Sequence, residues 1–564
     1  MLIQDAFIEQ FYSLIKSKHT LVLVNEDVDA LCASMILLHA FSCDDSPFSL
    51  CPVDSVKAIE KAIDDYSKQC KQVIMVNCGG HISLLDIELP QDITIFVVDS
   101  RRPFHLDNIY NEKNIRLLVR SSEVATWDVP DAQFIYDEDE SSSEDDEEGD
   151  RTATIERRIL KREEKNRWQN NRAQMLWKYY NHSWYSEPSS IFMLKLVHLL
   201  GKSNAQTVWC AATGLCSQLA DGLISSQNYL ELCNEHMMPF IAKYGRRNER
   251  SKKFQGEEIM MLTFEKELML PLYTKWDLYN ALTQDVGFCC STRMWAQEGE
   301  SKMKHTLASI GITLEECRQS YEALKTDRKE EIFSILDKHL NSMFFCFRSY
   351  RGYNQSLSAI DFARILSLRL EFHMPHSTET LIDRFQSSQA LMQSFFKNNG
   401  YLSNLDSALE QYKLALKTVQ SLVFGVLKQG MITAAGRNFY LVTLDHSNDV
   451  LYLSSRHCLN LFLFFALSGF VSNKKKMEKP FFAAVPSDLT DENTRYLCVT
   501  GCMPFIHIVR DLNRKTSIPM VFKQVCEQLK IPIIRNSLDP SVIQIREEDK
   551  NRFFDHLDIM LDPA

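Results

Sequence analysis

Apolar, β-branched runs alternate with amphipathic helical patterns through the first 135 residues of the chain. The runs predict strands at 20–24, 73–76, 93–98 and 115–119, and the amphipathic patterns predict helices at 5–16, 30–41 and 55–69. Strands that alternate with helices form parallel sheets with right-handed crossovers. We therefore predict an N-terminal α/β domain, residues 1–225, built around a doubly wound parallel sheet.

The rest of the chain divides into a helical middle and a second α/β region. Helical patterns dominate from about 225 to 420, which we divide into an insertion at 226–350 and a helical connector at 351–420. Strand signals return at 421–426, 439–443, 450–453, 481–485 and 496–500, with helices at 456–467 and 519–529. We predict a C-terminal α/β domain at 421–564.

An acidic, serine-containing run interrupts the N-terminal domain. Residues 137–150 hold ten acids and no base, so they account for most of the net charge of −11. A run of this composition cannot bury enough surface to fold, and we predict a disordered insert followed by a basic helix at 151–180. Ser141, Ser142 and Ser143 each precede an acid by three residues and are candidate phosphorylation sites; a plain solvated linker is the alternative.

Composition and cysteine spacing narrow the class of protein. The 564 residues are 45% hydrophobic and 24% charged, as in soluble globular proteins. We expect no signal peptide, and the longest apolar stretch, at 459–470, is too short to span a membrane. The sixteen cysteines include no Cys-x-x-Cys pair. We therefore predict no zinc site and free thiols in a reducing compartment, the cytosol or the nucleus.

Acidic and amide side chains follow three of the predicted strands. Asp27 and Asp29 come after the first strand, Asn77 after the second and Asp99 after the third. Because the carboxyl ends of parallel strands meet at one edge of a sheet, we expect these side chains to lie close together. Carboxylates and histidines at such an edge hold the two metal ions of phosphoesterases. The frame of such a site is present, but most of its ligands are missing.

At these positions the chain resembles the DHH phosphoesterase superfamily, which includes the RecJ single-strand exonucleases. Asn25-Glu-Asp27-Val-Asp29-Ala30 stands where the superfamily has His-x-Asp-x-Asp-Gly, and Asp99-Ser100-Arg101 stands where it has Asp-His-His. Asn77, before Cys78-Gly79, replaces an aspartate that bridges the metals. Gly214 and Asp221 match the fourth motif.

The replacements remove the chemistry that binds metal. The ligands at Asn25, Asn77 and Ser100 are replaced, and Arg101 adds a cation that repels a metal ion. We therefore expect no metal, no cofactor and no nuclease activity, and aspartates that accept backbone hydrogen bonds instead. The vestigial positions are Asn25, Asp27, Asp29, Asn77, Asp99, Ser100 and Asp221. The alternative is a divergent manganese-dependent single-strand exonuclease that uses Asp27, Asp29, Asp99 and Asp221.

A longer resemblance covers essentially the whole chain. It rests on Asp27-Val-Asp-Ala-Leu-Cys-Ala33, on Asn77-Cys-Gly79, on Asp99 with Arg102-Pro103, and on the order of acidic insert, basic helix, helical middle and second α/β domain. In these features the chain is similar to the cell division control protein 45 family. The resemblance implies a DHH-like N-terminal domain, a helical insertion that docks on the replicative helicase, a DHH-associated-like C-terminal domain and a cleft between the two α/β domains.

The function implied by the resemblance is that of a nuclear, non-catalytic scaffold in DNA replication. Such a scaffold joins the minichromosome-maintenance hexamer and the GINS tetramer, and meets other replication-fork proteins but no membrane. The cleft is expected to contact single-stranded DNA, with a free single-strand-binding module as a further alternative. The candidate DNA contacts are Arg101, Arg102, Arg246, Arg247, Arg250, Lys252 and Lys253.

Overall fold

The computed structural model describes most of the chain in twelve stretches. They are residues 1–90, 92–136, 151–244, 260–340, 343–351, 355–372, 379–396, 401–474, 479–491, 494–504, 514–533 and 538–561. The acidic insert at 137–150, with Ser141, Ser142 and Ser143, lies outside the described residues. So does the basic cluster that contains Arg246, Arg247, Arg250, Lys252 and Lys253.

A six-stranded parallel sheet organises the N-terminal region, as predicted. Its order is β1-β7-β5-β4-β2-β3. The strands are β1 (Leu2–Gln4), β2 (Thr20–Asn25), β3 (Phe48–Val53), β4 (Gln72–Val76), β5 (Thr94–Val98) and β7 (Ile115–Val119). The two edge strands, β1 and β3, were not predicted. β1 has only three residues, and β3 is not a continuous apolar run because it includes Pro52 and begins with an exposed Phe48.

Both faces of this sheet are covered, as a doubly wound sheet requires. Alternate strand residues such as Val22 and Leu23 point to opposite faces and belong to different apolar clusters. One face packs against α2 (Val28–Cys43), α8 (Ser189–Leu199), α9 (Ala205–Ala220) and the helical turns η1 (Ile8–Tyr12) and α1 (Ser13–Ile15). The other face packs against α3 (Val56–Tyr66) and α4 (Leu106–Tyr110). The prediction of a doubly wound sheet is confirmed.

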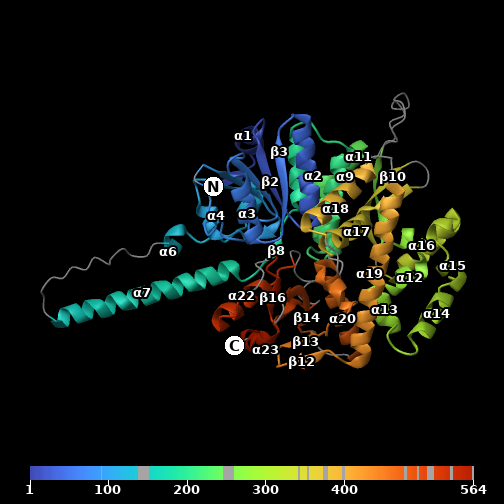
Figure 1. Cartoon of the computed structure of the whole chain (residues 1–564). Helices are drawn as coiled ribbons and strands as arrows, with labels where there is room; N and C mark the ends of the chain where they lie inside the picture. The colour runs from blue at the N-terminus through green and yellow to red at the C-terminus, as the bar shows by residue number, and fades with distance from the viewer. Residues whose placement is uncertain are drawn as a thin grey trace.

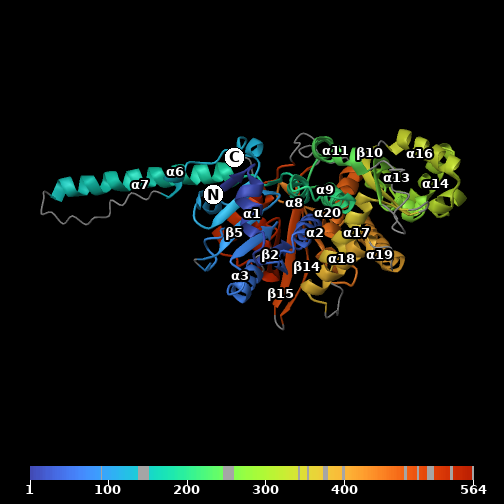
Figure 2. The same cartoon turned by 90° about the horizontal axis from the view of Figure 1, so that it is seen from above.

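The predicted basic helix is present as α7 (Arg151–Tyr180), and it extends away from the body in both views (Figures 1 and 2). Its last turn is anchored to the N-terminal region. The Tyr179 hydroxyl donates to the Phe104 carbonyl at 2.9 Å, and the Tyr180 hydroxyl accepts from the Leu106 amide at 2.9 Å. The short helices α5 (Ser121–Val124) and α6 (Ala132–Tyr136) precede it.

The middle of the chain is mostly helical, as predicted, but it also contains an antiparallel sheet. The helices are α10 (Ser226–Leu232), α11 (Met238–Tyr244), α12 (Leu278–Thr283), α13 (Val286–Thr292), α14 (Gly299–Ser309), α15 (Leu314–Arg318) and α16 (Thr326–Leu340). The sheet joins β9 (Met261–Leu268), β10 (Met343–Arg351) and β11 (Gln355–Ser358). The sequence did not indicate β9 because the strand includes Glu267. This side chain is buried and accepts hydrogen bonds from Arg348 Nε and from the Tyr273 hydroxyl, each at 2.5 Å.

Three long helices lead to the C-terminal region: α17 (Ala359–Glu371), α18 (Leu381–Phe396) and α19 (Tyr401–Gln429). The predicted strand at 421–426 is wrong, because these residues belong to α19. There Val423 and Val426 are buried at helical spacing. The predicted strand at 450–453 is also wrong, because a 3₁₀ turn, η6 (Val450–Ser454), takes its place. Short apolar runs do not distinguish strand from buried helix.

A mixed five-stranded sheet forms the C-terminal region, in the order β12-β13-β14-β15-β16. Its strands are β12 (Thr433–Ala435), β13 (Phe439–Thr443), β14 (Phe481–Asp491), β15 (Thr494–Cys502) and β16 (Val542–Arg546). Helices α20 (Arg456–Lys474), α22 (Ile518–Leu529) and α23 (Lys550–Met560) pack on it. This confirms the predicted second α/β region, while the boundaries drawn near 225, 350 and 420 stay predictions.

The two sheets lie one above the other in Figure 1, the N-terminal sheet in blue and the C-terminal one in red. We call the regions around them the N-lobe and the C-lobe. Among the described residues no helix is both long and apolar enough to cross a membrane. All sixteen cysteines are free thiols.

Candidate functional site

The first vestigial carboxylate caps a helix. β2 ends at Asn25, and Asp27 is the N-cap of α2, where its Oδ1 accepts a hydrogen bond from the Ala30 amide at 2.7 Å. Asn25 Nδ2 donates to Asp27 Oδ2 at 2.5 Å. Both oxygens of Asp27 are therefore occupied by donors of the protein itself.

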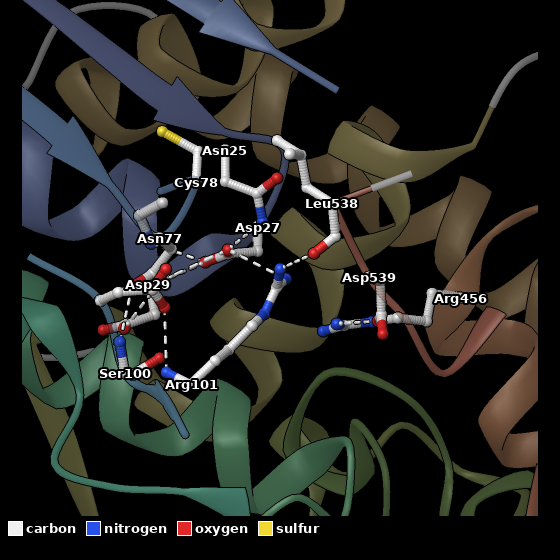
Figure 3. A network of polar contacts seen from close by, with 12 residues as sticks. Asn25, Asp27, Asp29, Asn77, Cys78, Ser100, Arg101, Arg456, Leu538 and Asp539 are labelled. Atoms are coloured by element: carbon white, nitrogen blue, oxygen red, sulfur yellow. Dashed lines mark hydrogen bonds and ion pairs between the residues drawn. The ribbon is translucent and has the colours of Figure 1, made fainter. Parts of the chain in front are cut away.

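Asn77 lies at the centre of the cluster (Figure 3). Its Nδ2 donates to Asp27 Oδ1 and to Asp29 Oδ2, each at 3.1 Å. Its Oδ1 accepts from the Ser100 amide at 3.1 Å and from the Ser189 hydroxyl at 2.6 Å. These donors fix which end of the amide faces the carboxylates, so Asn77 presents N–H groups to them and not a ligand oxygen.

Asp29 is held by the N-terminus of α8. Its Oδ2 accepts from the Ser189 amide at 2.8 Å, and its Oδ1 accepts from the Ser190 amide at 3.0 Å and from the Ser190 hydroxyl at 2.6 Å. A helix N-terminus favours negative charge. Even so, burial, followed by the charge of Asp27, raises the pKa of Asp29 to about 6.

Asp99 accepts hydrogen bonds from the backbone of two loops. Its Oδ2 accepts from the Gly80 amide at 3.0 Å and its Oδ1 from the Arg101 amide at 2.9 Å. Asp27, Asp29, Asn77 and Ser100 are therefore brought together at one edge of the sheet, with Asp99 directly before Ser100 in the chain, as the strand pattern predicts.

The two arginines that follow β5 are buried and engaged within the protein. Arg101 is 7% exposed, with Nη2 3.9 Å from Asp27 Oδ2 and Nη1 donating to the Leu538 carbonyl. Arg102 is 5% exposed and binds both oxygens of Glu123, at 2.5 and 3.0 Å, while its guanidinium lies 4.1 Å from the Phe104 ring centre. Their role as candidate DNA contacts stays a prediction, and any such contact competes with these pairs.

Asp221, the remaining vestigial position, belongs to a second charged cluster. It is the C-cap of α9, and its Oδ1 lies 2.5 Å from His457 Nδ1. Arg456 Nη2 lies 3.4 Å from Asp221 Oδ2, and Arg456 Nη1 donates to Asp539 Oδ2 at 2.7 Å. The cluster thereby joins the end of α9, in the N-lobe, to the start of α20 in the C-lobe.

Glu371, the last residue of α17, completes this second cluster. It accepts from the His457 amide at 2.8 Å and from the Ser455 hydroxyl at 3.0 Å, and lies 3.9 Å from Arg456 Nε. Burial raises the pKa of Glu371 to about 7, against the attraction of Arg456. Burial alone would raise the pKa of Asp221 as well. The charges of His457 and Arg456 outweigh that effect, so the pKa of Asp221 lies below its usual value.

Two cavities adjoin these clusters. The larger, about 1110 Å³, lies between the lobes and is lined by His81, Trp184, Arg514, Lys515 and Lys523 among others. The smaller, about 350 Å³, is lined by Asn25, Glu26, Asp54, Glu371 and Arg384 among others. The smaller cavity is therefore the one next to the end of β2.

The first cluster does not fit a divalent metal ion. The oxygens of Asp27 and Asp29 that a metal would need already accept hydrogen bonds from Asn77, Ser189 and Ser190. The Arg101 guanidinium adds a positive charge beside Asp27. Within the stretches that the structure describes, no group of three or more His, Cys, Asp or Glu side chains is arranged to hold a metal.

Comparison with known proteins identifies the family to which this chain belongs. The family model described as CDC45 matches residues 20–148 and 130–560. The chain belongs to the CDC45 family. It is 26% identical over 575 residues to the Cell division control protein 45 homolog of Homo sapiens, with 99% of each chain covered. It is 21% identical over 628 residues to Cell division control protein 45 of Saccharomyces cerevisiae, with 94% of each covered.

A solved structure supports the same fold. The crystal structure of CDC45 from Entamoeba histolytica covers 100% of both chains, with a TM-score of 0.69 at 19% identity. The exonuclease RecJ bound to manganese aligns with 97% of this chain and 91% of its own, with a TM-score of 0.41 at 10% identity. The α/β fold with a parallel N-terminal sheet, a helical middle and a mixed C-terminal sheet is thus that of the CDC45 family.

Several residues of the two clusters were not identified from the sequence. Ser189 and Ser190 begin a helix 160 residues after Asp29, and nothing in their local pattern marks them. Arg456 and His457 are the first two residues of a predicted helix. Their polar side chains at the start of so apolar a helix could have marked them as candidates for a site. Asp539 follows a stretch in which we predicted no element.

Proposed function

We propose that this protein is a non-catalytic scaffold subunit of the replicative DNA helicase. It joins the minichromosome-maintenance hexamer and the GINS tetramer in the nucleus, for initiation and fork progression. Membership of the CDC45 family over nearly the whole length supports this proposal most directly. A helicase scaffold needs surface rather than an active site, and the helical middle with its small sheet supplies that surface.

The filled carboxylate cluster supports the non-catalytic part of the proposal. A two-metal phosphoesterase needs free carboxylate oxygens to hold the ions that activate water. Here protein donors occupy the oxygens of Asp27 and Asp29, and Arg101 contributes the neighbouring cation. The alternative, a manganese-dependent exonuclease, has no comparable observation in its favour.

Contact with single-stranded DNA is the finer part of the proposal. Arg514, Lys515 and Lys523 line the larger cavity between the lobes, so a strand held there would meet positive charge. Binding of this kind weakens steeply as salt rises. Phosphorylation of Ser141, Ser142 and Ser143 stays a prediction.

Recovery of a tagged copy of the chain from nuclear extract tests the partners. We expect the hexamer and GINS to co-purify in amounts comparable with the tagged chain. A matched tagged chain in which Arg348→Ala breaks the buried pair with Glu267 should recover less of both, because that pair holds the small sheet together. Recovery of the unmodified chain free of both partners would contradict the proposal.

A further inference from the structure

The two cavities share one wall. Arg101, Arg456, Asp539 and Val542 line both the larger and the smaller cavity. The larger cavity lies between the lobes on the side of α22, and the smaller one is lined by Asn25 and Glu26 at the end of β2. Three charged side chains and one valine therefore border both spaces.

Charged groups from both lobes build this wall. Arg101, in β6 (Arg101–Arg102), donates to the carbonyl of Leu538 in the C-lobe. Arg456 of the C-lobe pairs with Asp539 at 2.7 Å and reaches Asp221 of the N-lobe at 3.4 Å. Figure 3 shows Arg101, Arg456 and Asp539 facing one another between the lobes.

The wall is held by polar contacts that are not all satisfied. Arg456 Nε is buried without a hydrogen-bond partner and lies 3.9 Å from Glu371 Oε1, an ion pair without a hydrogen bond. Arg101 makes one carbonyl contact and one ion pair at 3.9 Å. Buried ion pairs often return little net stability, because their desolvation offsets their attraction. Such a wall can open at a lower cost than an apolar core.

A backbone contact beside the larger cavity can act as the hinge. Ser183, just before β8 (Trp184–Tyr185), and Thr516 of the C-lobe exchange two backbone hydrogen bonds, at 2.8 and 2.9 Å. Ser183 and Thr516 both line the larger cavity, as Arg101, Arg456 and Asp539 do. Besides the apolar core that the lobes share, they are thus joined by backbone at one place beside the larger cavity and by ion pairs at another.

We infer that Arg101 and Arg456, with Asp221, Glu371 and Asp539, form an ion-pair gate that divides one interlobe passage into two cavities. While the gate is closed, a ligand in the larger cavity does not reach the smaller cavity at the end of β2. If single-stranded DNA enters the cleft, as the proposed function requires, the gate confines the strand to the larger cavity. Only this last consequence rests on the proposed function.

Native cysteines allow the gate to be tested without DNA. Cys498 lines the smaller cavity and is 8% exposed, Cys43 is exposed, and Cys32 lies in the core of the N-lobe. Alkylation by N-ethylmaleimide, followed for each cysteine by mass spectrometry, compares their rates in one sample. The full chain is used, as wild type, Arg456→Gln and Asp539→Asn.

We expect both substitutions to speed the alkylation of Cys498 at least tenfold, with the rates at Cys43 and Cys32 unchanged. The matched control is Arg546→Gln, because Arg546 is in the same lobe, is 46% exposed in its side chain and pairs with the exposed Glu548 at 3.6 Å. This control should leave all three rates unchanged.

Two outcomes would overturn the gate. In the first, Cys498 reacts at the wild-type rate in both variants. In the second, Cys32 accelerates together with Cys498 in both, which would show that these residues hold the whole fold together and do not control a passage. Neither outcome depends on DNA binding, which is measured separately with a labelled oligothymidine. A working gate without strand binding would reject only the single-strand part of the proposed function.

Discussion

Replacing Asn77 with aspartate would restore the charge that a metal-bridging ligand carries. The new carboxylate would lie where Nδ2 now lies, 3.1 Å from oxygens of both Asp27 and Asp29. Two like charges about 4 Å apart repel by about 4 kcal/mol at an effective dielectric constant of 20, and here there are two such pairs. A third carboxylate is therefore too costly to keep ionised in this cluster.

The new side chain avoids most of this repulsion by taking up a proton. Holding an aspartic acid protonated at pH 7, when its ordinary pKa is about 3.9, costs about 4 kcal/mol. We expect Asn77→Asp to destabilise the N-lobe by about that amount at pH 7. At pH 5 the cost falls by roughly 3 kcal/mol, since each pH unit is worth about 1.4 kcal/mol.

Thermal unfolding at pH 7 and pH 5, with and without manganese, measures this effect. At roughly 2–4 °C per kcal/mol, the N-lobe transition should fall by on the order of 10 °C at pH 7 and recover most of that loss at pH 5. Asn170→Asp, on the exposed side of α7, is the control and should change nothing. Recovery of the transition by manganese at pH 7 would refute the reasoning, because it would show that Arg101 and the protein donors leave room for a metal.

Three further substitutions test individual contacts, each by the same unfolding assay. Asp29→Asn should be less destabilising at pH 7 than at pH 4, by about 3 kcal/mol. In the folded wild type the pKa of Asp29 is raised to about 6, so the wild type loses stability as that carboxyl ionises, whereas the variant does not. Gly214→Ala should cost about 1–3 kcal/mol, because its Cβ would lie 2.2 Å from Ser190 Oγ, whereas Gly425→Ala, with open space around it, should not. Arg102→Ala should cost about 3 kcal/mol or more by leaving Glu123 without its ion-pair partner. If any of the three variants kept full stability, the contact attributed to the replaced residue would be contradicted.

The sequence was sufficient to predict the parts of the fold that local patterns determine. The four central strands of the N-lobe sheet are continuous apolar runs, and helical patterns separate the first two of them, so a parallel sheet could be predicted from strand–helix alternation. The small sheet of the middle region could not be predicted in this way, because buried Glu267 in β9 pairs with Arg348, which lies 81 residues away in β10. Local patterns carry no information on such distant pairs.

The same division applies to the site. Asp27, Asp29, Asn77 and Asp99 were found because they follow strands whose ends must meet. The groups that neutralise them were not, since Ser189 and Ser190 come from a helix far along the chain and the Arg101 contact at Leu538 crosses the lobes. That the aspartates accept backbone hydrogen bonds could be predicted; which distant groups donate to them required the structure.

One gel tests the central claim, that the protein serves helicase assembly and does not cut DNA. Forked duplex DNA with an end label is incubated with the minichromosome-maintenance hexamer and GINS, with and without this chain, in the presence of ATP, magnesium and manganese. We expect unwound strands of full length only when the chain is present. Shortened strands produced by the chain alone, and absent when Asp29→Ala is used, would contradict the claim and identify a working nuclease.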